Sequence, residues 1–113
     1  MAAVAVGGIL ALTVGCAPQQ PAPSSLVGKT LEDSQDGLPG SLVIVDLTPN
    51  VVHQPPAYNG GEDPSRWSVI AACRSSDDQG YILGVVPRGD ATSQVNIDAK
   101  KGVYTSLLIG CKK

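Results

Sequence analysis

The three cysteines carry the most distinctive chemistry in this chain of 113 residues. Cys16 ends an apolar leader and follows Leu12-Thr13-Val14-Gly15, whose last residues before the thiol are small. A run rich in Pro and Gln, residues 17–23, begins immediately after it. Small residues give a signal peptidase access to the bond before a cysteine whose thiol has been acylated. The pattern therefore predicts cleavage before Cys16 and lipid on its sulfur.

Leu12-Thr13-Val14-Gly15-Cys16 resembles the lipobox of bacterial lipoproteins. The resemblance implies a signal peptide over residues 1–15, palmitate-type acylation of Cys16, and an extracytoplasmic protein anchored to the cell membrane by its lipid. Residues 2–14 are too few for a permanent membrane helix, which needs about twenty apolar residues, but they suit a signal peptide. The alternative is a buried apolar helix of the domain, against which Gly7-Gly8 and the abrupt polar linker argue.

Residues 16–25 are expected to form a tether between the lipid and the folded part of the chain. Pro alternates here with Ala, Gln and Ser, which favours an extended polyproline-like segment without a packed core. At about 3.1 Å per residue, such a tether reaches roughly 30 Å. The remaining residues, 26–113, are enough for one small domain and no more.

Cys73 and Cys111 remain as a pair once Cys16 carries lipid. Such a pair in an exported protein usually forms a disulfide, and closing a loop of roughly forty residues stabilises a domain by about 4 kcal/mol. The alternatives are two free buried thiols or a metal site, but the chain offers no His or Cys spacing that suits zinc. We predict the disulfide, without a metal or cofactor.

The charge of the chain argues against a nucleic acid partner. The formal net charge is −2, and basic residues form only short pairs such as Lys100-Lys101 and Lys112-Lys113. Binding DNA or RNA needs a concentrated basic face and stacking aromatics, whereas this chain has no Phe, one Trp and three Tyr. Arg88-Gly89-Asp90 is predicted to be a turn between elements, because Gly and Asp favour turns.

The residues also favour a protein that is not an enzyme. The only histidine, His53, lies in a Val-Val-His-Gln-Pro-Pro context without a nucleophile motif beside it. Paired carboxylates for glycoside cleavage are the alternative, since Glu62-Asp63 and Asp77-Asp78 fall in predicted loops. Such enzymes need a walled cleft, which a domain of this size rarely builds.

Recognition by a surface is then the favoured kind of function. The candidate surface is the Pro- and Gly-rich loop over residues 50–65, with His53, Tyr58 and the following Trp67. Exposed aromatics beside small flexible residues suit carbohydrate stacking or protein contacts. The alternative, which we favour, is that Trp67 and Tyr81 are ordinary core residues.

A short helix is predicted from Leu31 to Asp36, because Thr30 can cap its first turn and Gly37 follows its end. Val27, Leu31 and Leu38 are its expected core contacts. The stretch 26–35, Leu-Val-Gly-Lys-Thr-Leu-Glu-Asp-Ser-Gln, resembles the start of a PASTA domain. That resemblance implies a small module of bacterial envelope proteins in which one helix packs on a three-stranded sheet.

Three strands are predicted in the middle of the chain. Residues 41–47 are rich in β-branched side chains and are expected to form a central strand, closed by a turn at 48–50. Residues 66–73 and 81–86 flank the turn residues 77–80 and predict a hairpin. In the first hairpin strand, alternation places four residues on one face: Trp67, Val69, Ala71 and Cys73. Arg66-Trp67-Ser68-Val69 with a nearby Cys is also similar to segments of small secreted actinobacterial proteins.

The C-terminal third predicts a helix followed by a fourth strand. Residues 92–102 offer a possible N-cap, Lys in the last turn and Gly past the end. Residues 103–109 favour a strand, with a terminal helical turn as the alternative. As a strand, this segment would turn one set of residues inward: Val103, Leu107, Ile109 and Cys111.

These elements predict a small single α+β domain, with a short helix packed on a mainly antiparallel sheet of three to four strands. The expected function is that of a non-enzymatic, membrane-anchored envelope lipoprotein that binds a cell-wall component, such as peptidoglycan, or an envelope protein. The alternative is a small inhibitor or prophage-type exclusion lipoprotein that blocks another membrane or envelope protein.

Overall fold

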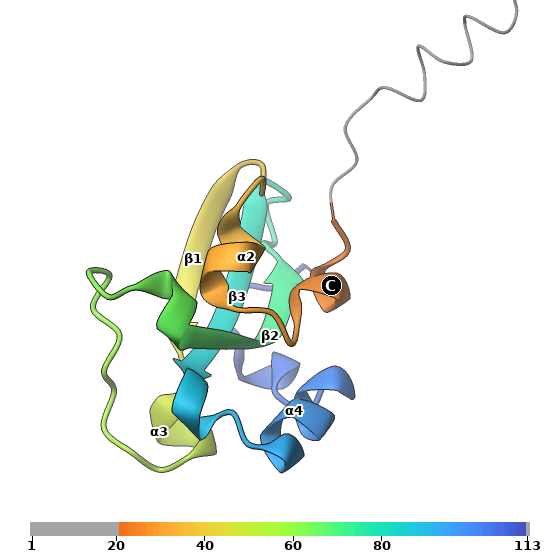
Figure 1. The fold of residues 1–113 in the computed structure, drawn as a ribbon. Helices are drawn as coiled ribbons and strands as arrows, with labels where there is room; N and C mark the ends of the chain where they lie inside the picture. Colours follow the sequence, from red (N-terminus) through yellow and green to blue (C-terminus); the bar gives the residue numbers. More distant parts are fainter. Residues whose placement is uncertain (1–20, 113) are drawn as a thin grey trace, which may run out of the picture.

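A computed structural model describes residues 21–112 (Figure 1). The predicted signal peptide, residues 1–15, and the predicted lipidation site Cys16 lie outside the described residues. The described part is a small α+β domain built on one three-stranded sheet, as the sequence predicted.

The sheet has the order β1-β3-β2 and is mixed. β1 spans Ser41–Asp46, β2 spans Trp67–Arg74 and β3 spans Gly80–Pro87. β2 and β3 form the predicted antiparallel hairpin, whereas β1 runs parallel to β3. The parallel pair departs from the mainly antiparallel sheet that we expected. It arises because the chain crosses from β1 to the far edge of the sheet, so that the hairpin inserts β3 between β1 and β2.

The prediction of a central strand over residues 41–47 is therefore wrong, since β1 lies at an edge of the sheet. β3 is the central strand, and its residues from Gly80 to Val86 are all buried. The turn predicted at 48–50 is a short helix, α3, over Thr48–Val51. The segment after it, residues 52–63, is irregular, as expected.

Both faces of the sheet are covered by short elements (Figure 1). One face packs against η1, a 3-10 turn over Pro23–Leu26, and against helix α2, Leu31–Gln35. The other face packs against helix α4, Ser93–Lys100, and a 3-10 turn, η4, over Thr105–Leu107. Strands buried on both sides read as continuous apolar runs, which explains the sequences of β2 and β3.

A bulge in β2 breaks the alternation that the sequence predicted. Val69 pairs with Val85 and Ala71 pairs with Gly84, so Ile70 is the extra residue. Trp67 and Val69 pack on the α2 face of the sheet. Beyond the bulge, Ala71 and Cys73 pack on the α4 face instead. The predicted common face is therefore wrong for Ala71 and Cys73, because one inserted residue reverses the side of every residue that follows.

Both predicted helices are present, and side chains cap both of them. Thr30 accepts a hydrogen bond from the Asp33 amide at the start of α2, at 3.1 Å. Thr92 accepts one from the Val95 amide at the start of α4, at 3.3 Å. The hydroxyl of an N-cap residue satisfies an amide that has no partner within the helix. The predicted turn at Arg88–Asp90 is a 3-10 turn, η3.

The strand predicted over residues 103–109 does not form, and the helical turn that was its alternative does. The backbone hydrogen bonds of residues 103–108 are local; for example, the Leu107 amide donates to the Tyr104 carbonyl at 3.0 Å. Leu108 is the buried residue, whereas three of the residues predicted to face inward are exposed: Val103, Leu107 and Ile109. Leu108 packs on the sheet over Gly84, and Tyr104 is partly buried against the same core cluster.

The fold begins before Leu26, so the predicted tether over residues 16–25 is too long. The Tyr81 hydroxyl donates to the Pro21 carbonyl at 2.6 Å, and η1 places Leu26 in the core. Just after η1, Gly28 N–H bonds the Val69 carbonyl, and Val69 N–H bonds the Lys29 carbonyl, each at 2.9 Å. Residues 21–25 therefore belong to the domain, because the burial of Leu26 and this pairing with β2 hold them in place.

Candidate binding surface

The structure does not bring the predicted surface residues His53, Tyr58 and Trp67 together as one exposed patch. Trp67 starts β2 and is only 4% exposed. The Tyr58 ring meets it edge-on, with centroids 5.1 Å apart and an interplanar angle of 85°. The core alternative is therefore correct for Trp67, and also for Tyr81, which is buried.

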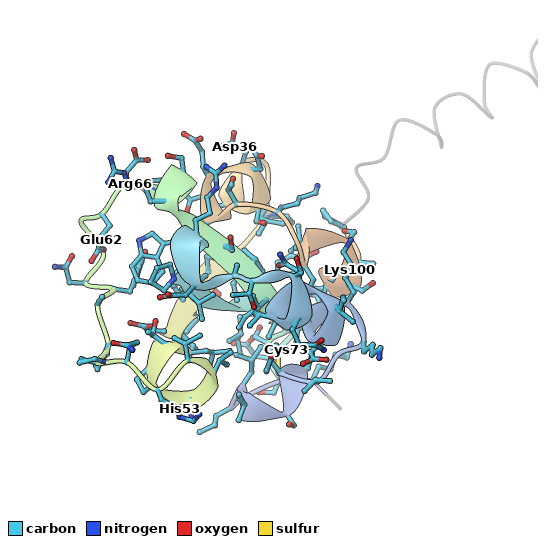
Figure 2. The ribbon with its side chains drawn as sticks, turned by 60° about the horizontal axis from the view of Figure 1, so that its bottom comes forward. Asp36, His53, Glu62, Arg66, Cys73 and Lys100 are labelled. Carbon is cyan, nitrogen blue, oxygen red and sulfur yellow. A yellow bond between two sulfur atoms is a disulfide. The ribbon has the colours of Figure 1, made fainter. Side chains whose placement is uncertain are left out.

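His53 is exposed, unlike Trp67. It follows α3 and has a φ of 57°, a left-handed conformation that is uncommon outside glycine. Figure 2 shows His53 at the lower edge of the molecule, well away from Glu62 and Arg66 at the upper left. His53 and Glu62 belong to the irregular segment over residues 52–63. We name this segment the clamped loop, because two carboxylates hold its backbone.

Asp46, the last residue of β1, is the first of these carboxylates. Its Oδ2 accepts the amides of Ala57 at 2.7 Å and Tyr58 at 2.9 Å, across the loop. Its Oδ1 accepts the Thr48 amide at 2.9 Å and also the Thr48 hydroxyl. Both oxygens are thus used, one at the start of α3 and one in the middle of the clamped loop.

The ionised form of Asp46 is favoured by this environment. Partial burial alone would raise the pKa of Asp46, but the hydrogen bonds from the Thr48 hydroxyl and from the amides of Tyr58, Thr48 and Ala57 outweigh it. The pKa therefore lies below its ordinary value of 3.8. Asp46 was not among the predicted site residues. The signal was present in Asp46-Leu47-Thr48, since Asp commonly accepts the amide two residues later.

Glu62 is the second carboxylate, and it closes the tip of the clamped loop. It accepts the amides of Asn59 at 2.7 Å and Gly60 at 3.0 Å, while the Asn59 side chain accepts the Gly61 amide at 2.9 Å. Asp63 in turn accepts the amide and hydroxyl of Ser65, and these bonds lower its pKa. These acidic residues, which were candidates for acid–base chemistry, thus bind their own backbone.

The outer side of the clamped loop is a short Pro-rich stretch. All four residues of Gln54–Ala57 are exposed. The stretch lies between α3 on one side and the Asp46 contacts on the other, so both of its ends are held. This is the part of the loop that a partner could contact without displacing the core.

The predicted pair Cys73 and Cys111 forms a disulfide, with Cα atoms 5.6 Å apart. Beside it lies an open hollow of about 330 Å³. The hollow is lined by residues of the C-terminal segment: Thr105, Ser106, Leu108, Gly110, Cys111 and Lys112. Among residues 21–112, no group of three His, Cys, Asp or Glu side chains is placed to hold a metal ion.

The chain matches no known protein family, no curated protein and no solved structure. The lipobox and PASTA resemblances therefore remain predictions from short sequence motifs. Within the part of the chain that the structure describes, no helix has the length and apolar character to cross a membrane.

Proposed function

We propose that this protein is an extracytoplasmic, lipid-anchored, non-enzymatic lipoprotein whose domain binds an envelope component through the clamped loop. The observation that carries the proposal is the backbone clamp of Asp46 on Ala57 and Tyr58, which orders an exposed Pro-rich stretch. A loop that is ordered before it binds loses less conformational entropy on binding, which favours affinity.

The side chains of this stretch favour a protein partner over a polysaccharide. Stacking on sugars needs the open face of an aromatic ring. Trp67 is buried, and Tyr58 packs against it, so the two rings nearest to the loop are engaged with each other. What the loop exposes is Gln54-Pro55-Pro56-Ala57, a stiff extended segment of the kind that apolar grooves of proteins bind. An envelope protein is therefore the proposed partner, and peptidoglycan is the other outcome of the test.

The partner is tested by photocrosslinking in the cells that make the protein. A photoreactive amino acid replaces Gln54 in the full chain, and a matched variant carries it at Gln35, an exposed residue of α2. We expect a discrete protein adduct from position 54 and none from position 35. Adducts of wall fragments would indicate peptidoglycan binding instead. Equal adduct patterns from both positions would contradict binding through the clamped loop.

The anchor is tested by Cys16→Ser. We expect the variant to lose fatty-acid labelling and to leave the membrane fraction, whereas the unsubstituted protein retains both. The reason is that two or three acyl chains, at about 0.8 kcal/mol per buried methylene, make attachment effectively permanent. Retention of the variant in the detergent phase would mean that the apolar leader itself is the anchor.

A further inference from the structure

The place where the chain enters the domain limits how far the domain can lie from an anchor at Cys16. Pro21 is held by the Tyr81 hydroxyl at 2.6 Å, and η1 follows at once. Only residues 17–20 separate Pro21 from Cys16. Five extended steps span at most about 18 Å. That reach is shorter than the diameter of a domain of this size, whose radius of gyration is about 12 Å, so the end that carries Pro21 must face the anchor.

The C-terminal segment lies at this same end of the sheet. Tyr81, which holds Pro21, pairs with Arg74 across the hairpin. The Arg74 carbonyl accepts the Lys112 amide at 2.8 Å, and the Gly110 carbonyl accepts the Ser76 amide at 2.7 Å. Residues 109–112 therefore run beside the turn that joins β2 to β3, where β3 begins.

The most exposed large apolar side chain of residues 21–112 is found here. Ile109 is 90% exposed. Lys112, three residues later in the chain, is half exposed. Its ammonium lies 3.3 Å from the Asp78 carboxylate, which also pairs with the Arg74 guanidinium at 2.9 Å. An exposed apolar side chain with a lysine a few residues away in the chain suits a segment that lies in the membrane interface.

The clamped loop lies at the opposite end of the sheet. Asp46, which holds the loop, is level with Val85, four residues along β3 from Tyr81. At about 3.3 Å per residue, that is roughly 13 Å along the strand. In Figure 1 the described chain begins at the right of the view, and the clamped loop lies at the left.

We propose that the domain docks on the lipid surface of the membrane through this end, with Ile109 inserted at the interface and Lys112 near the headgroups. The clamped loop then points away from the membrane, where a partner can reach it. The inference rests on the proposed lipid anchor at Cys16, because the short connection is what brings this end to the bilayer.

The test uses the full-length protein isolated from the cells that make it and reconstituted in vesicles of brominated phosphatidylcholine, which quenches tryptophan near the acyl chains. An I109W variant reports on the proposed contact. An I97W variant is the matched control, because Ile97 is also exposed, at 49%, but lies on α4. Trp67 is buried and gives the same background in both.

We expect loss of emission in brominated vesicles for I109W and not for I97W, with both variants floating with the vesicles. Flotation without selective quenching of I109W would overturn the docking and leave the anchor intact. Failure to float would overturn the anchor and the docking together. The two proposals are thus distinguished by the same experiment.

Discussion

Asp46 is the residue that connects the sheet to the clamped loop. Each of its oxygens accepts backbone amides, from Thr48 on one side and from Ala57 and Tyr58 on the other. A carboxylate that accepts several amides forms stronger bonds than a neutral side chain. The order of the middle of the clamped loop therefore depends on this ionised group, whereas Glu62 holds the tip.

Asp46→Asn should lower the free energy of unfolding at neutral pH by about 1–3 kcal/mol, since hydrogen bonds to a charged group are lost. Urea unfolding followed by circular dichroism measures the change. Asp36→Asn is the matched control, because Asp36 is exposed at the end of α2. An equal effect of both substitutions would contradict the special role of Asp46.

The same residue predicts a pH dependence. The pKa of Asp46 is lower in the folded protein than its ordinary value of 3.8. Its stabilising contribution is therefore full above that value and is lost as the pH falls through the folded pKa. The stability difference between the unsubstituted protein and Asp46→Asn should shrink when urea unfolding is repeated below about pH 4. A difference that stays constant to pH 2 would show that the charge of Asp46 is not the cause.

Among the secondary-structure elements, the central strand β3 carries Gly84 on the face that α4 covers. The glycine lets core side chains on that face lie close to the strand. A Cβ at this position would lie 2.5 Å from Leu47 Cδ1 and 3.1 Å from Leu108 Cδ2. Leu47 and Leu108 come from different parts of the chain, and both are buried. The absence of a side chain at Gly84 is what allows both to pack there.

Gly84→Ala should destabilise the domain by about 1–3 kcal/mol, because the added methyl overpacks the core. Gly89→Ala is the matched control, since a Cβ there would meet nothing within 4 Å. The comparison of urea midpoints measures both effects. Similar midpoints for the two variants would mean that Leu47 and Leu108 can move aside.

For the whole molecule, the disulfide joins the core to the C-terminal segment. Cys73 lies in β2 and Cys111 follows η4, with a sequence separation of 38. Apart from Leu108, the residues from Val103 to Gly110 bury little, so the covalent bond supplies a constraint that packing does not. The bond also fixes the end of the domain that we propose to face the membrane.

Replacing both Cys73 and Cys111 by Ala should lower the free energy of unfolding by about 4 kcal/mol, because the unfolded chain regains the entropy of an open loop. Urea unfolding without reductant measures this loss. Adding reductant to the unsubstituted protein is the control and should bring it to nearly the same midpoint. Two alkylatable thiols in the untreated protein would contradict the pairing.

Local features of the sequence were enough to predict several elements. Thr30 before α2 and Thr92 before α4 mark caps, which act within one helical turn. The turn residues at 77–80 predict the hairpin, since its strands are adjacent in the chain. The cysteine pair followed from counting and from the predicted export. Each of these depends on interactions between neighbouring residues or on the chemistry of one residue type.

Tertiary structure alone decided the rest. The extra residue at Ile70 reverses the faces of Ala71 and Cys73, and no local pattern marks it. Trp67 is buried because it lies on the α2 face of the sheet, where Tyr58 packs against it. Asp46 accepts a hydrogen bond from Ala57, eleven residues later in the chain. The edge position of β1 depends on where the chain crosses the sheet. These features were decided only by contacts between distant segments, because pairing and burial depend on which surfaces meet after folding.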